Sequence, residues 1–521
     1  MPETSRPGAS RQGRQTQLAI LTTALVAGVL APAGPTRTSG RTAPTGPASA
    51  TGIAVIVQQQ LFGDGRPEAA VRRLGGTVGA DLPIVGGFAA VVPAAGIAAL
   101  ELSPGVAAVS PDRAMAMQAT PAAEPSGPRN VYRSVIGADS LRADGVTGAG
   151  VTVALIDTGV AEVPDLADRI VPVYDDGRRT WGRCVNLSGE KTCADSYGHG
   201  TFMAGLIAGT GASSGGEFAG VAPGARVLSI KVAGRDGSTD VSNVLAAIQW
   251  VVSFRDTYNI RVLNLSLGTD GRQSYRTDPL NYAVERAWAA GIVVVVSASN
   301  RGPGPGTIAK PADDPYVLTV GAVDDEGTVP ASDDRLPNFS GRGPTAADGV
   351  AKPDLVAPGA HLVSLSAPGS EINARFPSSV DAAHRRGSGT SMSAAVVSGA
   401  AALYLQANPT ASPDRVKYAL TATARPVASD NVNDVGAGLV DVVAALDAPP
   451  GLANAGLGHS SGLGLLSLSR GSLRVRSTST GLLGPLLGIV VQGQLTLQLL
   501  LWNPLAYVTQ SWTPSSWYGS A

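Results

Sequence analysis

The sequence predicts an α/β fold in which a mostly parallel central sheet lies between two layers of helices, preceded by a small α+β unit. Apolar runs rich in β-branched residues alternate with helical patterns from about residue 131 to residue 446. These runs are apolar throughout, which is typical of parallel strands buried on both faces. Ahead of them, residues 53–109 have the order strand, helix, strand, strand, helix, strand, which predicts a ferredoxin-like unit.

The elements of the N-terminal unit follow from local patterns. Short β-branched runs predict strands, and segments with helical spacing between Gly-containing turns predict helices. The predicted strands are 53–57, 77–78, 87–92 and 106–109, and the predicted helices are 67–74 and 95–101. Residues 112–119 follow as an extended tail.

The elements of the larger unit are predicted in the same way. Its strands are 151–156, 226–232, 262–265, 292–296 and 317–320, and its helices are 200–208, 242–254, 281–290 and 394–405. Ligands of such sheets bind beyond the carboxyl ends of the strands. Asp157, Ser266 and Asn300 lie at these ends, so we expect a functional site there.

The first 33 residues have the three parts of a secretory signal. Three arginines within the first 14 residues precede an apolar run, 18–30, and small residues follow at 31–33. The run is too short to span a membrane comfortably. We therefore expect residues 1–33 to be removed and the protein to be secreted. Residues 34–51 are rich in Pro, Thr, Ser and Gly and are predicted to form a linker.

The C-terminal tail, residues 451–521, differs in composition from the rest of the chain. It is rich in Gly, Leu and Ser, and no charged residue follows Arg476. Between residues 492 and 501 polar side chains alternate with leucines, which favours a strand. Pro485 and the glutamines weigh against a membrane span. The role of this tail stays open, including a contact with the membrane or the cell surface.

Charge and cysteine content narrow the classes of function. The 39 Lys and Arg residues balance 40 Asp and Glu residues, giving a net charge of −1 without a basic stripe, so no nucleic-acid partner is expected.

Cys184 and Cys193 lie close together in a polar loop. In an exported protein, a disulfide is favoured over two free thiols or half a metal site. A monomer is expected.

A glycine-rich turn, Gly389-Thr390-Ser391, leads into the apolar helix 394–405. Ser391 is therefore a candidate nucleophile, because main-chain N–H groups and the helix dipole at a helix N-terminus stabilise a nearby oxyanion. The same pattern also fits a helix N-cap without chemistry. Other stretches of the chain decide between these interpretations.

Three other motifs carry matching chemistry. Leu-Ile-Asp-Thr-Gly ends a strand on Asp157, Gly-His-Gly-Thr begins a helix on His199, and Val-Val-Val-Ser-Ala-Ser-Asn ends a strand near Asn300. In these motifs, and in the order Asp, His, Ser, the sequence resembles the subtilisin-like serine proteases, peptidase family S8.

The resemblance implies the subtilisin-like three-layer fold and a role for each residue in peptide hydrolysis through an acyl-enzyme. Ser391 is expected to be the nucleophile. His199 is expected to take its proton and donate it to the leaving amine, while Asp157 orients the imidazole and stabilises its charged form. Asn300 matches the asparagine of the oxyanion hole.

The resemblance also implies a substrate-binding strand. Ser266, Leu267 and Gly268 match the segment that pairs with the main chain of an extended substrate. Ala309 is expected near the floor of the first specificity pocket and Arg301 near its rim. Protein or peptide substrates with a medium or large apolar residue at the cleaved position are expected, with Arg301 making acidic residues more acceptable.

The N-terminal unit resembles the propeptides that chaperone and inhibit these proteases. A zymogen is therefore expected, with residues 52–118 as an intramolecular inhibitor, 119–450 as the catalytic domain and self-cleavage between residues 115 and 124. The alternative is a catalytically silent relative that binds peptides or a surface. The complete set of Asp157, His199, Ser391 and Asn300 weighs against it.

No organic cofactor is expected, and a metal site is not defined by the sequence. Calcium is common among the resembling proteases as a stabilising ion, but no dense loop of oxygen ligands with a defined spacing is visible. Asp165 and Asp195 are the candidate ligands. Phe202-Met203, beside His199, and residues 393–396 depart from the usual family motifs.

Overall fold

The computed structural model describes residues 52–117, 130–175, 178–376, 380–427 and 429–464. They all belong to one compact unit, residues 46–521. The expected signal, linker and cleavage region after residue 117, and the tail beyond residue 464, lie outside the described residues. Within the described ranges, no helix is long and apolar enough to cross a membrane.

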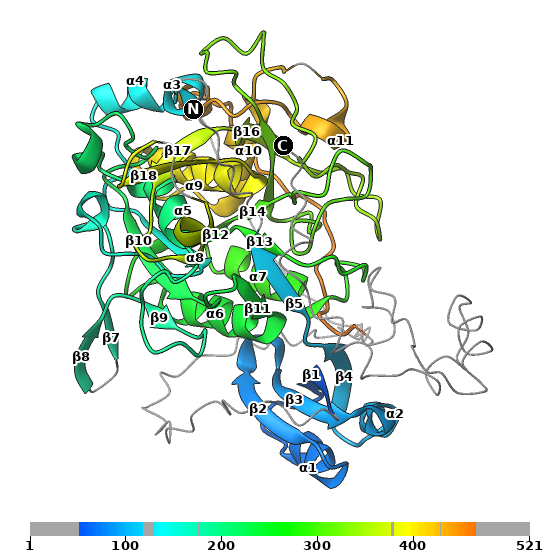
Figure 1. The fold of residues 1–521 in the computed structure, drawn as a ribbon. Helices are drawn as coiled ribbons and strands as arrows, with labels where there is room; N and C mark the ends of the chain where they lie inside the picture. The colour runs from blue at the N-terminus through cyan, green and yellow to red at the C-terminus, as the bar shows by residue number, and fades with distance from the viewer. Residues whose placement is uncertain (1–51, 118–129, 176–177, 377–379, 428, 465–521) are drawn as a thin grey trace, which may run out of the picture. The chain divides into compact units, whose positions relative to one another are not determined.

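A seven-stranded sheet forms the centre of the larger unit, and all its paired strands are parallel (Figure 1). From one edge to the other the strands are β16 (Leu355–Pro358), β15 (Leu318–Val323), β14 (Val293–Ser297), β12 (Ile260–Leu265), β6 (Thr152–Asp157), β10 (Arg226–Lys231) and β9 (Val185–Asn186). Every residue of β6, β14 and β15 is buried. The predicted α/β class is therefore confirmed, although β9 and β16 were not predicted.

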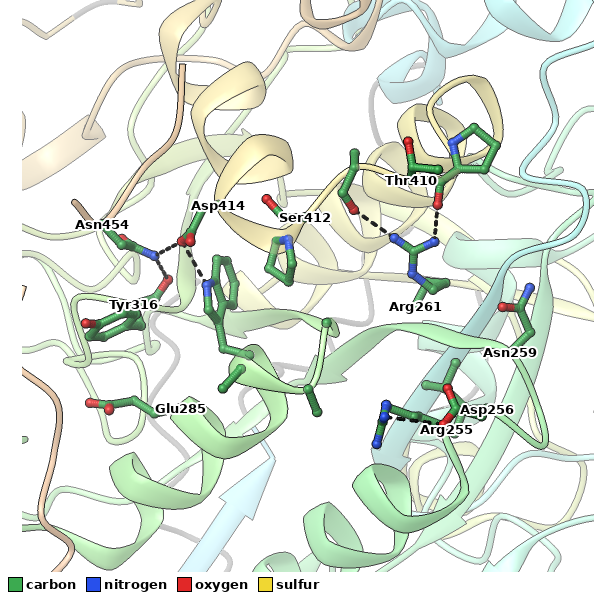
Figure 2. Close-up of a pocket in the computed structure, with 18 of the residues that line it drawn as sticks. Arg255, Asp256, Asn259, Arg261, Glu285, Tyr316, Thr410, Ser412, Asp414 and Asn454 are labelled. Carbon is green, nitrogen blue, oxygen red and sulfur yellow. Dashed lines mark hydrogen bonds and ion pairs between the residues drawn. The ribbon is translucent and has the colours of Figure 1, made fainter. Parts of the chain in front are cut away.

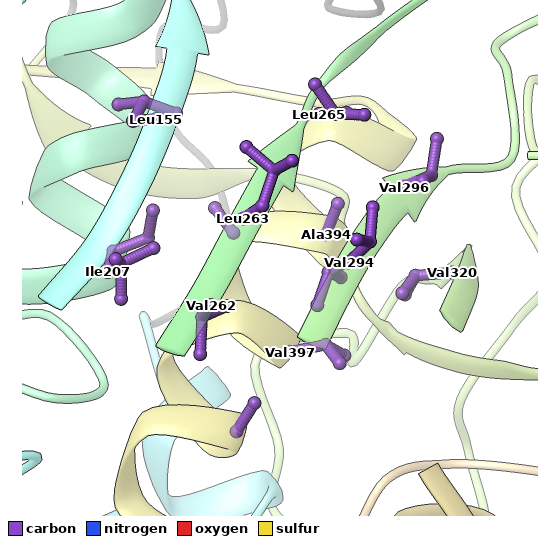
Figure 3. Packing of buried hydrophobic residues seen from close by; sticks show 14 of the residues in the cluster. Leu155, Ile207, Val262, Leu263, Leu265, Val294, Val296, Val320, Ala394 and Val397 are labelled. Carbon is purple, nitrogen blue, oxygen red and sulfur yellow. The ribbon is translucent and has the colours of Figure 1, made fainter. Parts of the chain in front are cut away.

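Helices account for this burial on both faces of the sheet. Helices α5 (His199–Ala208) and α9 (Thr390–Ala407) pack together, and α9 crosses β12, β14 and β15. Helices α6 (Val241–Phe254) and α7 (Pro279–Ala289) pack against each other and contact β6 and β14, respectively. Figure 3 shows the apolar side chains of α9 and the strands meeting in the core.

The connections contain further elements that the sequence did not predict. The helices are α3 (Tyr132–Val135), α4 (Ala138–Ala143), α8 (Glu371–Arg375), α10 (Pro413–Ala422), α11 (Val432–Val435) and α12 (Val442–Leu446). The antiparallel pairs are β7 (Val173–Asp175) with β8 (Arg178–Gly182), and β17 (Leu362–Leu365) with β18 (His384–Gly387). Strand β18 has the polar sequence His-Arg-Arg-Gly, and Arg385 donates hydrogen bonds to Asn373 and Phe376. A pattern of apolar residues therefore could not reveal it.

The N-terminal unit has the predicted order of elements. These are β1 (Gly52–Gln59), α1 (Arg66–Arg73), β2 (Thr77–Leu82), β3 (Gly87–Pro93), α2 (Ile97–Glu101) and β4 (Val106–Pro111). The antiparallel sheet order β2-β3-β1-β4 is that of a ferredoxin-like unit. Alternate residues of β1 point to opposite faces, so Val55 and Val57 lie in the unit's own core while Ile56 joins the core of the larger unit.

A third sheet links the two units. Strand β5 (Ala114–Met117) lies between β11 (Ser238–Asp240) and β13 (Leu267–Gly268), antiparallel to both (Figure 1). Just before β5, a carboxylate oxygen of Asp112 accepts a hydrogen bond of 2.7 Å from the main-chain N–H of Ser242 in the first turn of α6. The segment after β4 is therefore held along the larger unit.

Candidate active site

Asp157 and His199 form a buried pair at the carboxyl end of the central sheet. Asp157 is the last residue of β6, and His199 is the first residue of α5. Nδ1 of His199 lies 2.8 and 2.9 Å from the two carboxylate oxygens of Asp157, and both side chains are 1% exposed. Because Nδ1 faces a carboxylate, it carries the proton, and Nε2 is the basic nitrogen of the neutral ring.

A second buried carboxylate, that of Asp195, supports this pair. It accepts hydrogen bonds from Thr158 Oγ1 at 2.8 Å, from Gly198 N–H at 2.7 Å, and from the main chain and hydroxyl of Thr201 at 2.8 and 2.7 Å. Asp195 therefore ties the turn after β6 to the first turn of α5. The sequence suggested it only as an ion ligand; its position just before the N-terminus of a predicted helix was the signal for this capping role.

Ser391 lies within the first turn of α9, because the helix begins at Thr390 and not at the predicted residue 394. Its Oγ donates to the main-chain oxygen of Ser266 at 3.2 Å. Nε2 of His199 has no hydrogen-bond partner among the described residues, so the expected bond between Ser391 and His199 is not formed in this conformation. Rotation about χ1 changes the acceptor of a serine, and such catalytic bonds often tighten only when substrate is bound.

The first turns of α5 and α9 lie close together. Phe202 of α5 and Met392 of α9 both border Gly387, with side-chain carbons 3.3 and 2.8 Å from the position that a Cβ would take there. The helix that carries His199 and the helix that carries Ser391 therefore meet at their N-terminal ends.

The side chain of Asn300 has a fixed orientation. Its Oδ1 accepts hydrogen bonds from the main chain and the hydroxyl of Thr390, at 2.9 and 3.0 Å. The other end of the amide, Nδ2, can only donate. Ser299 precedes it with φ of +139°, a conformation that residues other than glycine rarely adopt. Asn300 is thus tied to the residue that precedes Ser391.

Strand β5 occupies the main-chain edge beside Ser391. Met117 pairs with Leu267, and Ala116 pairs with Gly268, while the other edge of β5 pairs with β11. Met115 and Met117 are each 2% exposed and belong to the apolar core. The segment predicted to pair with an extended chain therefore does so, and apolar pockets accept alternate side chains of that chain. Strand β11 was not predicted as the second edge.

Ala309 and Arg301, the two residues predicted to shape the specificity pocket, differ in burial. The N–H of Ala309 donates to the carbonyl of Ala298, just beyond β14, at 2.8 Å. The next residue, Lys310, pairs with Thr269, just beyond β13. Ala309 therefore lies on a segment that joins the two strand ends bordering the site, and it is buried. Arg301 follows Asn300 and is exposed.

Cys184 and Cys193 form a disulfide in the loop that precedes α5. The same loop carries Glu190, which pairs with the buried Nζ of Lys231, the last residue of β10, at 2.9 Å. These two links hold the approach to His199 against the sheet.

Both carboxylates that were suggested as ion ligands have hydrogen-bond donors around them. Asp195 accepts the hydrogen bonds described above, and Asp165 accepts from the main chain and the hydroxyl of Ser213. Among the described residues, no group of three or more His, Cys, Asp or Glu side chains could hold a metal ion.

A pocket of about 660 Å³ lies between the ends of α6, α7 and α10 and contains none of the predicted site residues. Figure 2 shows that several of its charged groups have partners. Arg255 pairs with Asp256, Arg261 donates to main-chain carbonyls, and Asp414 accepts from Trp288 and Asn454.

Comparison with known families agrees with this geometry. The family model described as "Subtilase family" matches residues 148–443, more than half of the chain. The chain belongs to the subtilase family. As a subtilase it is a hydrolase of the serine endopeptidase class.

Several individual relatives are bacterial proteases. It is 40% identical to serine protease AprX of Bacillus subtilis (strain 168) over 302 residues, which cover 57% of this chain and 66%, just under two thirds, of AprX. It is 33% identical to an alkaline protease of Alkalihalobacillus alcalophilus, covering 67% of this chain and 76% of that protein. It is 34% identical to subtilisin Savinase of Lederbergia lenta, covering 58% and 92%.

A solved structure shares the fold. Fervidolysin from Fervidobacterium pennivorans, described as a keratinolytic enzyme related to subtilisin, superimposes with a TM-score of 0.59 at 24% identity, covering 77% of this chain and 61% of that one. This agreement confirms the predicted subtilisin-like fold.

Proposed function

We propose that this subtilase is a secreted endopeptidase that cleaves peptide bonds through an acyl-enzyme on Ser391 and is made as a self-processed zymogen. The observation that carries the proposal is the buried pair of Asp157, at the end of β6, and His199, at the start of α5, which packs against the helix that carries Ser391.

In the proposed reaction, Ser391 Oγ bonds to the carbonyl carbon of the substrate while its proton passes to Nε2 of His199. Asp157 stabilises the resulting imidazolium through Nδ1–H. The carbonyl oxygen becomes an oxyanion, which accepts from Nδ2 of Asn300 and from the N–H of Ser391. His199 then gives its proton to the leaving amine as the C–N bond breaks, and water hydrolyses the acyl-enzyme by the same sequence of steps.

The position of β5 supports the zymogen proposal. Met117, the last described residue before the gap, pairs with Leu267, and the carbonyl of the adjoining Ser266 accepts from Ser391 Oγ. Gln118 itself lies outside the described residues. We therefore propose that the bond between Gln118 and Ala119 is cut, which falls within the interval predicted from sequence. Residues 52–118 then act as the intramolecular inhibitor until they are released.

The same strand supports the class of substrate. Met115 and Met117 are buried, and Ala114 is exposed, as expected for an extended chain read on alternate side chains. Protein or peptide substrates with apolar residues at the two corresponding positions are proposed. Secretion is supported by the apolar run at 18–30 and by the disulfide, and we propose that the enzyme works as a monomer.

The test compares the parent protein, Ser391→Ala and Ser393→Ala after export from the expressing cell. Intact mass gives the first residue of each product, and casein hydrolysis gives the activity. We expect the parent to start at Ala119 and to cut casein. Ser391→Ala should keep residues 52–118, start near residue 34 and be inert. Ser393→Ala, on the same helix, should behave as the parent does.

Each alternative outcome has a meaning. If Ser391→Ala is trimmed at the same bond as the parent, another protease does the processing. If the parent also keeps residues 52–118 and leaves casein intact, the cleft belongs to a silent peptide-binding relative. If the products of the parent and of both variants still start at Met1, the prediction of a secretion signal is wrong.

A further inference from the structure

Segment 459–464, where the described part of the C-terminal tail ends, lies with one side against the fold. Ser460, Gly462 and Gly464 are buried, whereas the residues between them are exposed. Such alternation is typical of an extended chain that turns one face toward the protein. The segment therefore has an inner side and an outer side.

The larger unit holds the first half of this segment. The N–H of Ser460 donates to both oxygens of Glu285, and its hydroxyl donates to the carbonyl of Asp278 at 3.3 Å. The N–H of Ser461 donates to the carbonyl of Arg276 at 2.7 Å. The segment is therefore attached to the larger unit before it reaches its last residues.

The end of the segment contacts the N-terminal unit. The hydroxyl of Ser110, in β4, donates to the carbonyl of Gly464 at 3.0 Å, and Ser110 is 2% exposed. A Cβ at Gly462 would lie 3.4 Å from Nε2 of Gln58, a buried residue of β1. In Figure 1 the orange end of the described tail lies beside β4.

This contact belongs to the interface between the two units. Ser110 pairs with Ile56, and Ile56 joins the core of the larger unit. Side chains of directly paired residues, and of residues two apart along a strand, lie on the same face of a sheet. Ser110 and Gln58 are therefore on the face of the N-terminal sheet that packs on the larger unit, and segment 459–464 extends the surface beneath that face.

Gly464 fits closely in this position. A Cβ there would lie 1.3 Å from Nε2 of Gln273 and 2.7 Å from the carbonyl oxygen of Thr277. Gln273 is buried, and its Nε2 donates to that carbonyl at 3.0 Å, so moving it aside breaks a buried hydrogen bond. We therefore expect a side chain at residue 464 to push the segment away from Ser110.

We propose that segment 459–464 is part of the surface that holds the N-terminal unit, so that the C-terminal tail slows the departure of this unit after the chain is cut. The partner of the segment is residues 52–117 of the same chain. Differences in affinity within one interface lie mostly in the dissociation rate, so losing the buried hydrogen bond between Ser110 and Gly464 should speed this departure. The consequence, a longer delay between self-cleavage and full activity, rests on the proposed function.

The test uses the full chain carrying Ser391→Ala, which prevents self-cleavage, with the recognition sequence of a site-specific protease inserted between residues 120 and 121. The chain is immobilised through a C-terminal tag and cut with that protease, and the N-terminal unit appearing in the wash is measured over time. We expect Ser110→Ala and Gly464→Ala each to raise the dissociation rate roughly 5- to 30-fold.

Two further variants are matched controls. The hydroxyl of Ser103 donates within its own unit, and a Cβ at Gly458 would meet the flexible end of the Arg276 side chain at 3.1 Å. Ser103→Ala and Gly458→Ala should therefore release the unit at the rate of the reference chain. Because Ser110→Ala and Gly464→Ala act on one contact, their combination should release the unit no faster than the faster single variant.

The proposal is wrong if Ser110→Ala and Gly464→Ala release the unit at the reference rate, including a release too fast to follow in every chain. It is also wrong if their effects on the rate multiply in the double variant, because the two residues then act independently. The added protease makes the cut, so the result does not depend on catalysis by Ser391. If the variants behave as expected but the parent leaves casein intact, the proposed function fails while this contact stands.

Discussion

Asn300 illustrates how neighbouring groups set the chemistry of one residue. Its Oδ1 is held by two donors from Thr390, so the Nδ2 donor can be directed only toward another acceptor. Thr390 and Asn300 were recognised from different motifs, and only the fold joins them. The strained main chain at Ser299 adds to this fixed geometry.

Asn300→Asp should retain the acceptor oxygen and replace the donor by a second oxygen. We expect kcat to fall by about 10²–10³, a range known for subtilisin itself and so carried over rather than obtained from this structure. KM for a peptide substrate should change little. Steady-state kinetics on purified mature enzyme test this, with Asn408→Asp at the end of α9 as the control. A loss confined to KM would remove Asn300 from the oxyanion site.

Among the structural elements, residues 451–464, the first part of the C-terminal tail, form a strap that is hydrogen-bonded to the rest of the fold. His459 stacks on Tyr316 with ring centres 4.6 Å apart and contacts Glu285 at 3.0 Å. The N–H of Ser460 donates to both oxygens of Glu285, at 2.8 and 3.0 Å. Ser110 of the N-terminal unit donates to the carbonyl of Gly464 at 3.0 Å. The composition of the tail gave no sign of these contacts.

A chain that ends at Pro450 should be less stable than one that ends at Gly464. Glu285 is 4% exposed, and loss of the strap leaves its carboxylate without these donors, which costs about 1–3 kcal/mol. Thermal unfolding of both chains in the Ser391→Ala background measures the difference. Glu285→Gln should recover part of the loss in the shorter chain only. Equal Tm values for the two chains would mean that the strap contributes no stability.

For the molecule as a whole, buried charges set how stability depends on pH. Asp314 is buried beneath α7, where Asn281 and the N–H of Tyr316 donate to it. Burial, together with the charge of Glu285, raises the pKa of Asp314 to about 8. The folded protein therefore holds a proton that the unfolded chain releases near pH 3.8, so this residue lowers stability as the pH rises from about 4 to about 8.

Asp314→Asn should remove that dependence. Between pH 5 and pH 8 the free energy of unfolding of the parent should fall, relative to the variant, by up to about 1.4 kcal/mol per pH unit. Urea unfolding at several pH values in the Ser391→Ala background measures both slopes. Asp348→Asn, at a less buried carboxylate, controls for the loss of a charge. Parallel curves for parent and Asp314→Asn would contradict the assignment.

Sequence alone determined the features that depend on local pattern. Continuous apolar runs identified the main buried strands, since only a sheet covered on both faces hides every side chain. The motifs at Asp157, His199 and Ser391 were recognisable because each marks a strand end or a helix start. The order of elements in the N-terminal unit was predictable for the same reason.

The tertiary structure decided what depends on residues distant in sequence. It made Asp195 a support of the Asp157 and His199 pair and brought β11 beside β5. Polar side chains have many possible partners, and their roles are fixed only by what lies across from them. Apolar burial follows from composition along the chain, whereas hydrogen bonds and charge pairs follow from position in space.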